Sequence, residues 1–143
     1  MDKEFVTYEI GIALKQLGFY NECMAFYPNV YTRENHLIYD TSFIERTLGE
    51  CSNLNTKMQD GGAFVAPLWQ QVIEWFREQH QIFIELPKMR WIDTGYGIQI
   101  KQYNKKLTLC SAAKYSGAKT YEEAREQGVL KAIEVVKKRN KQL

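Results

Sequence analysis

The segment from Pro67 to His80 constrains the fold of this chain more than any other. Pro67 takes a first-turn position of a helix, where proline is favoured because its missing N–H has no intrahelical partner to lose. Apolar side chains then recur at helical spacing, at Leu68, Val72, Trp75 and Phe76. Three further side chains, Trp69, Ile73 and His80, widen this face beyond half of the circumference. The pattern predicts a helix covered on more than one side, and packing against a sheet usually gives that cover.

A second helix is predicted from Thr7 to Leu17, near the start of the chain. Thr7 is a good N-cap, and Gly18 stands where a left-handed C-terminal cap favours a residue without a Cβ. The core-facing stripe consists of Ile10, Ala13, Leu14 and Leu17.

The last helix is predicted from the capping box Thr120-Tyr-Glu-Glu123 to about Arg139. Its inner stripe has small side chains, at Ala124, Gly128, Ala132 and Val135. A glycine inside a helix costs about 1 kcal/mol relative to alanine. We therefore expect Gly128 to allow a close approach of this helix to the sheet.

Strand patterns fill the intervals between these helices. We expect a strand, a turn at Pro28-Asn29 and a second strand after Glu22, then a short strand at 37–39. A capping box at Ser42–Glu45 predicts a short helix to about Gly49. Three strands are expected after His80, at Ile82–Leu86 continuing through Met89–Asp93, at Tyr96–Tyr103 and at Leu107–Ala113. The predicted fold class is α+β, with an antiparallel sheet packed against two to three helices in the order α-β-β-(α)-α-β-β-β-α.

Length and composition predict one globular domain over residues 1–143, with an internal loop near 52–63. A chain of 143 residues with 45% hydrophobic and 25% charged residues has the usual size and mix of a single domain. No apolar run approaches the roughly 18 residues of a membrane span, and no signal peptide is evident. Three scattered cysteines suit reduced thiols, so we expect a cytoplasmic protein.

The sequence offers little for catalysis, and we assign no catalytic residue, no metal and no cofactor. His36 and His80 are far apart, and no cysteine lies near either at ligand spacing. The sequence contains no nucleophile elbow, Walker loop or dinucleotide fingerprint. A small enzyme remains a third hypothesis, and it would need a deep pocket that holds Cys110, His80 or a carboxylate pair.

Aromatic residues make up 13% of the chain and cluster in the predicted strands. Neighbouring strand residues face opposite ways, so Phe26 and Tyr27 cannot both lie in the core. Exposed tyrosines suit recognition of a protein partner, or of a second copy in a homodimer. The alternative is that tyrosine only prefers half-buried sheet positions. The candidate binding residues are Tyr27, Tyr31, Tyr96, Tyr103 and Tyr115.

Charge is distributed unevenly along the chain. Residues 1–72 carry a net charge of −4 and residues 73–143 a net charge of +6. Nucleic-acid binding by the basic half is therefore the alternative function. The densest basic run, Lys137-Lys138-Arg139-Asn140-Lys141, has a simpler explanation as the solvated end of a helix. The candidate nucleic-acid contacts are Lys101, Lys105, Lys106, Lys114, Lys119, Lys137, Lys138 and Arg139.

Three segments together resemble a family of small uncharacterised proteins from phages and mobile elements of Bacteroidetes. They are the middle segment Ala66-Pro-Leu-Trp-Gln-Gln-Val-Ile-Glu-Trp-Phe-Arg-Glu78, the opening Tyr8 to Tyr27 with Ala13-Leu-Lys-Gln-Leu-Gly-Phe19, and the close Thr120-Tyr-Glu-Glu-Ala124 with Ile133-Glu-Val-Val-Lys137. Val30–Gly62 falls outside the resemblance. It implies a phage or mobile-element protein that acts inside a bacterial cell, and it carries no catalytic residues.

Residues 67–139 also resemble a double-stranded RNA-binding domain in the predicted order helix, three antiparallel strands, helix. Such domains place lysines at the start of the last helix to meet phosphates. Here Lys119 is followed by Glu122 and Glu123, which would repel a phosphate. We therefore expect non-catalytic binding of a protein partner, with nucleic acid as the alternative.

Overall fold

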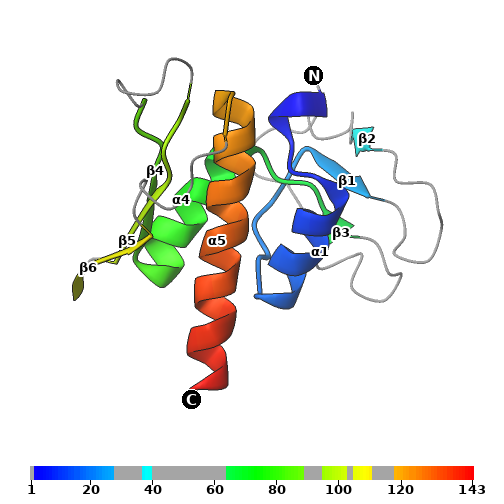
Figure 1. Ribbon diagram of the computed structural model, residues 1–143. Helices are drawn as coiled ribbons and strands as arrows, with labels where there is room; N and C mark the ends of the chain where they lie inside the picture. Colours follow the sequence, from blue (N-terminus) through cyan, green and yellow to red (C-terminus); the bar gives the residue numbers. More distant parts are fainter. Residues whose placement is uncertain (1, 28–36, 40–63, 89–94, 103–104, 111–117) are drawn as a thin grey trace. The chain divides into compact units, whose positions relative to one another are not determined.

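The computed structural model describes residues 2–27, 37–39, 64–88, 95–102, 105–110 and 118–143 (Figure 1). Several predicted features lie outside these ranges: the turn at Pro28-Asn29 with the strand that follows it, the short helix at 42–49, the loop near 52–63 and the strand continuation at 89–93. The chain divides into two compact units, Met1–Trp69 and Gln70–Leu143. A single domain over 1–143 stays a prediction.

Unit 1 combines a helix with a small antiparallel sheet. A 3-10 turn, η1 (Asp2–Glu4), precedes helix α1 (Tyr8–Gln16). The sheet has the strand order β2-β1-β3, with β1 at Ala25–Tyr27, β2 at Ile38–Tyr39 and β3 at Phe64–Val65. The predicted ends of the first helix are confirmed, because Thr7 is its N-cap and Gly18 follows it with a φ of +87°.

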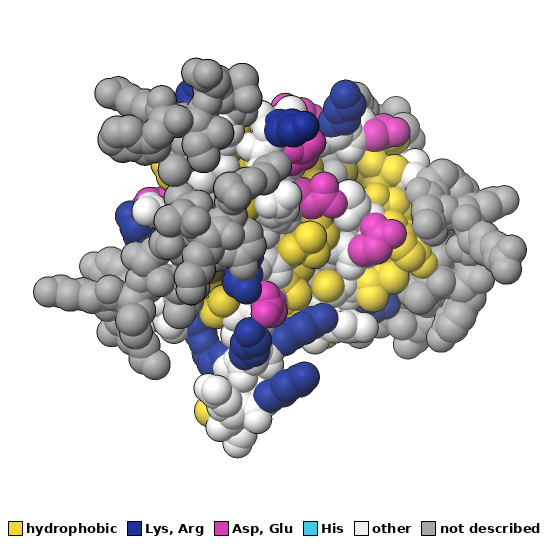
Figure 2. Space-filling view, viewed as in Figure 1, with side chains coloured by type: hydrophobic (Ala, Val, Ile, Leu, Met, Phe, Trp, Pro, Cys, Tyr) yellow, Lys and Arg dark blue, Asp and Glu magenta, His cyan; other side chains and the backbone are white. Residues whose placement is uncertain are grey.

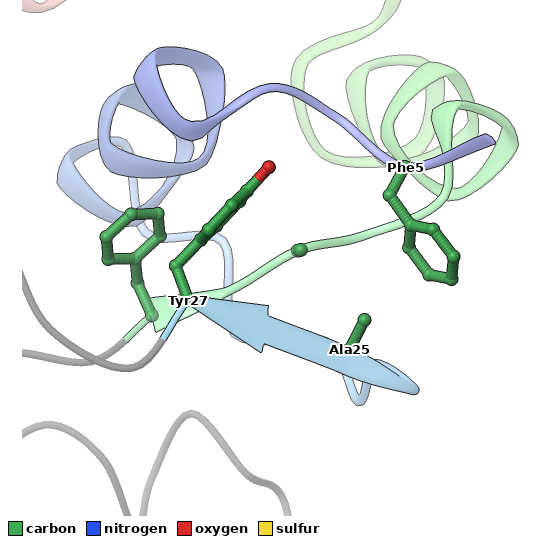
Figure 3. Packing of buried hydrophobic residues seen from close by; sticks show 5 residues of the cluster. Phe5, Ala25 and Tyr27 are labelled. Atoms are coloured by element: carbon green, nitrogen blue, oxygen red, sulfur yellow. The ribbon is translucent and has the colours of Figure 1, made fainter. Parts of the chain in front are cut away.

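The core of unit 1 joins the sheet to the segment that precedes α1. Phe5, Ala25, Tyr27, Phe64 and Ala66 form its buried cluster (Figure 3). Tyr27 points from β1 towards the N-terminal segment, where its hydroxyl donates a hydrogen bond to the carbonyl oxygen of Val6 over 2.9 Å. The ring of Tyr8 stands edge-on to Tyr27 and to Phe64, with centroid distances of 5.3 and 5.1 Å.

Helix α4 (Trp69–His80) begins two residues later than the sequence pattern predicts. Pro67 does not occupy its first turn, because Pro67 and Leu68 pair with the N-terminal segment instead. The N–H of Val6 donates to the carbonyl oxygen of Pro67 over 3.0 Å, and Leu68 bridges to Phe5. The helix itself is confirmed, with Val72, Trp75 and Phe76 buried along it.

Unit 2 contains the second antiparallel sheet and the long C-terminal helix. The sheet has the order β4-β5-β6, with β4 at Ile82–Glu85, β5 at Gln99–Gln102 and β6 at Lys105–Cys110. The register runs from Ile82 opposite Gln102 to Glu85 opposite Gln99. Helix α5 (Tyr121–Lys141) follows. The predicted α+β class with antiparallel pairing is confirmed.

Helix α5 lies close to the sheet at Gly128, as the sequence predicts. A Cβ at residue 128 would lie 2.9 Å from Cγ2 of Ile84 and 3.6 Å from Cγ2 of Ile98. The buried face of α5 consists of Ala124, Gly128, Val129, Ala132, Ile133 and Val136. The prediction that Val135 belongs to this face is wrong. Burial recurs every four residues after Gly128, at Ala132 and Val136, and Val135 is only half-buried. Within the described ranges, none of the helices has both the length and the apolar character that a bilayer span requires.

The contact at Gly128 predicts a clear effect of substitution. Gly128→Val should lower the free energy of unfolding by about 2 kcal/mol, because overpacking a filled site costs roughly 1–3 kcal/mol. Gln127→Val is the matched control, since Gln127 is exposed on the same helix. Urea denaturation of both variants checks this. Helix propensity alone would stabilise Gly128→Val and destabilise Gln127→Val, because valine is a better helix former than glycine and a poorer one than glutamine. An unchanged or raised stability of Gly128→Val would therefore contradict the close contact with Ile84.

Candidate interaction surfaces

The structure removes Tyr27 from the predicted set of exposed tyrosines. Tyr27 is only 7% exposed, while its neighbour Phe26 is half-buried on the other side of β1. The hydroxyl of Tyr27 has a backbone acceptor inside the core, so a tyrosine can take the inner position. Burial, followed by the charges of Glu9 and Asp2, raises the pKa of Tyr27 above its usual value. Tyr31, Tyr103 and Tyr115 lie outside the described residues.

Tyr96 is half-buried and belongs to an aromatic cluster at the start of α5. Its N–H donates to the carbonyl oxygen of Ala118 over 3.0 Å, and it also bridges to Lys88. Its ring meets the ring of Tyr121 edge-on, at a centroid distance of 5.7 Å and an angle of 75°. The guanidinium carbon of Arg125 lies 5.8 Å from the centre of the Tyr121 ring. We call Tyr96, Tyr121 and Arg125 the Tyr121 surface.

Tyr121 was missing from the predicted site residues, although it is 43% exposed. Its position directly after the N-cap Thr120 could have indicated this exposure. Thr120 Oγ1 accepts a hydrogen bond from the N–H of Glu123 over 3.2 Å, so the predicted cap is confirmed. Side chains in the first turn of a helix lie at its free end, where fewer neighbours cover them.

Among the predicted basic residues with described side chains, several face an acidic or carbonyl partner. Lys101 pairs with Glu85 at 2.6 Å, and Lys138 pairs with Glu134 at 2.8 Å. Arg139 donates through Nη1 to the carbonyl oxygen of His80 over 3.3 Å. Lys105 and Lys106 lie on β6, and Lys114 lies outside the described residues.

Lys119 and Lys137 are both exposed, but they lie towards opposite ends of α5. Lys119 precedes the N-cap, and the 16 helical steps from Tyr121 to Lys137 alone correspond to roughly 24 Å at about 1.5 Å per residue. The start of the helix is also acidic, and the carboxylate of Glu123 accepts a hydrogen bond from the N–H of Lys119 over 2.8 Å. The basic residues that gather on α5 therefore lie in its C-terminal part (Figure 2).

A groove of about 440 Å³ lies beside this C-terminal part of α5. Its lining residues are Gln102, Lys131, Glu134, Val135, Lys138, Arg139 and Gln142, and we call it the α5 groove. Glu134 is contacted by Lys131 at 2.7 Å and by Lys138 at 2.8 Å. These two hydrogen-bonded ammonium groups lower the pKa of Glu134 to about 2. The carboxylate is therefore charged across the physiological pH range.

His80 ends α4 next to Arg139. Its ring lies 4.5 Å from the ring of Trp75 and 5.8 Å from that of Phe76, measured between centroids. Burial, and after it the positive charge of Arg139, lowers the pKa of His80 below its usual value. Its Nε2 is buried and has no hydrogen-bond partner among the described residues. His80 is therefore a neutral part of the packing at neutral pH.

The described residues bring no three His, Cys, Asp or Glu side chains together as a metal site. Cys23 is buried, and burial together with the charge of Glu22 raises the pKa of its thiol to about 12. A thiol with such a pKa is protonated and unreactive at neutral pH.

Comparison with protein-family models, with curated proteins and with solved structures gives no match to this chain. The features that bear on function are therefore two surfaces of unit 2, the Tyr121 surface and the α5 groove.

The hydrogen bond of Tyr27 gives a stability prediction. Tyr27→Phe should lower the free energy of unfolding by about 1 kcal/mol, because it leaves the carbonyl oxygen of Val6 without its donor. Tyr20→Phe is the control, since Tyr20 is 47% exposed and water can replace contacts of its hydroxyl. Chemical denaturation measures both. An unchanged stability of Tyr27→Phe would mean that the hydroxyl does not contribute to the core.

His80 gives a prediction of pH dependence. Its folded-state pKa lies below the unfolded value near 6.5, so the unfolded chain binds the proton more readily. The contribution of His80 to stability should therefore be complete above about pH 6.5 and should be lost as the pH falls through the lowered folded-state pKa. Thermal unfolding from pH 8 to 5 should show a smaller loss in His80→Gln than in the wild type. Identical pH profiles would contradict the assignment.

Proposed function

We propose that this chain is a non-catalytic accessory protein of a phage or mobile element, and that it binds another protein in the bacterial cytoplasm. The resemblance of three segments to small phage and mobile-element proteins supports this setting. The Tyr121 surface supports the mode of action, and its exposed ring is the observation that carries the proposal.

The Tyr121 surface has the chemistry of an interface centre. Tyrosine and arginine are enriched among the residues that contribute most to protein–protein binding, since they combine a large contact area with a polar end. The backbone of Tyr96 is held by its pairing with Ala118 and Lys88, and the ring of Tyr121 rests against the ring of Tyr96. A partner would therefore meet a surface that is ordered in advance, which reduces the entropy cost of binding.

Nucleic-acid binding is the weaker proposal. Lys101 and Lys138 already face carboxylates, and Arg139 faces a backbone carbonyl. The acidic first turn of α5 separates Lys119 from the basic residues at the other end of the helix. A second copy of this chain on the Tyr121 surface is the remaining alternative to a foreign protein, and sedimentation distinguishes it.

Tyr121→Ala tests the proposal. The variant should weaken binding of the partner about 30-fold, because loss of a central aromatic residue costs about 2 kcal/mol. The partner is first captured from nuclease-treated bacterial lysate and purified, and its affinity is then measured with the wild type and the variant. Tyr20→Ala is the matched control, because Tyr20 is exposed to a similar degree in unit 1.

The outcomes are distinct. Retention of full affinity in Tyr121→Ala, or an equal loss in Tyr20→Ala, would contradict the Tyr121 surface as the binding site. Capture that disappears with nuclease treatment and at high salt would favour nucleic acid instead. A concentration-dependent dimer that Tyr121→Ala dissociates would make the partner a second copy.

A further inference from the structure

We propose that the α5 groove binds a phosphate monoester dianion, such as the terminal phosphate of a small metabolite or a mononucleotide. This site is separate from the Tyr121 surface, and it does not depend on the proposed protein partner. It follows from the charge, the donors and the volume of the groove.

The charges that line the α5 groove are unequal. Among the described lining residues, Lys131, Lys138 and Arg139 oppose one carboxylate, that of Glu134, which leaves a net charge of +2. Glu134 lies between the two lysines, and its carboxylate oxygens are 2.7 and 2.8 Å from their ammonium nitrogens. A phosphate monoester carries nearly two negative charges above pH 7, so its charge matches the excess of the groove.

The groove also offers hydrogen-bond donors. Arg139 lines the groove, and its Nη1 donates to the carbonyl oxygen of His80. A phosphate oxygen beside the Arg139 guanidinium would gain a charge-assisted hydrogen bond. The amides of Gln102 and Gln142 line the same groove and donate to oxygen as well. Arginine and amide groups together suit the several oxygens of a phosphate.

The helix dipole opposes an anion at this end of α5, but it is the smaller effect. The C-terminus of a helix is equivalent to about −0.5 elementary charge. The net charge of +2 among the described lining residues exceeds the partial charge of the helix end.

The groove volume of about 440 Å³ also leaves space beyond a phosphate for the group that carries it. A compact ligand is therefore favoured over an extended polyanion, whose contacts would have to continue past the groove.

The test titrates inorganic phosphate and adenosine 5′-monophosphate into the full chain at pH 7.5, with ionic strength held constant by sodium chloride. Nuclear magnetic resonance follows the side-chain amide signals of Gln102 and Gln142. Lys138→Gln should weaken binding by about threefold to tenfold, in line with the loss of one charge-assisted contact. Lys137→Gln is the matched control, because it removes the same charge from an exposed neighbour that does not line the groove.

Glu134→Gln is a second test of the proposal, because this variant should bind more tightly whereas a misfolded variant would bind more weakly. The substitution removes the one carboxylate among the described lining residues, so both ligands should bind at least about threefold more tightly. Absence of amide shifts at millimolar phosphate would overturn the proposal, and so would equal losses in Lys137→Gln and Lys138→Gln. A 5′-hydroxyl oligonucleotide that binds more tightly than both monoesters would also overturn it, in favour of a nucleic-acid surface.

Discussion

The close approach of α5 to its sheet at Gly128 is the contact on which unit 2 depends. Any side chain at this position would meet Cγ2 of Ile84, a branched strand residue with little freedom to move away. The absent side chain brings the helix down onto β4 and β5, where small and branched residues on both sides fill the space. With α5 fixed in this way, its two ends present different chemistry: an aromatic cluster at Tyr121 and a cationic groove at Lys138.

Unit 1 depends on a different kind of constraint, which is backbone pairing between distant segments. The N-terminal strand-like segment at Phe5 and Val6 pairs with Pro67 and Leu68. This pairing puts the carbonyl oxygen of Val6 where the Tyr27 hydroxyl can reach it. The core of the unit therefore forms only when segments from both of its ends have come together.

The sequence predicted those features that depend on neighbouring residues. Thr7 and Gly18 predicted the ends of α1, and Thr120 with Glu123 predicted the start of α5. The small side chain of Gly128 predicted a close contact, because a helix seldom tolerates glycine without such a reason.

Features that depend on distant partners could not be predicted in this way. Pro67 and Leu68 continue the apolar pattern of α4, and only their pairing with Val6 and Phe5 takes them out of the helix. Strand alternation showed that either Phe26 or Tyr27 faces the core, but the choice depends on the acceptor at Val6. The sequence pattern likewise placed Val135 on the inner face of α5, whereas the structure buries Val136 there.

The two surfaces of α5 are electrostatically opposed, and this separation limits what each can bind. Glu122 and Glu123 complement the positive end of the helix dipole, so the Tyr121 end repels a polyanion. Lys138 and Arg139 complement the negative end and provide more positive charge than the dipole requires. A single extended polyanion along α5 would gain at one end and lose at the other. The arrangement therefore favours two local and independent contacts, with an apolar and polar protein surface at one end and a compact anion at the other.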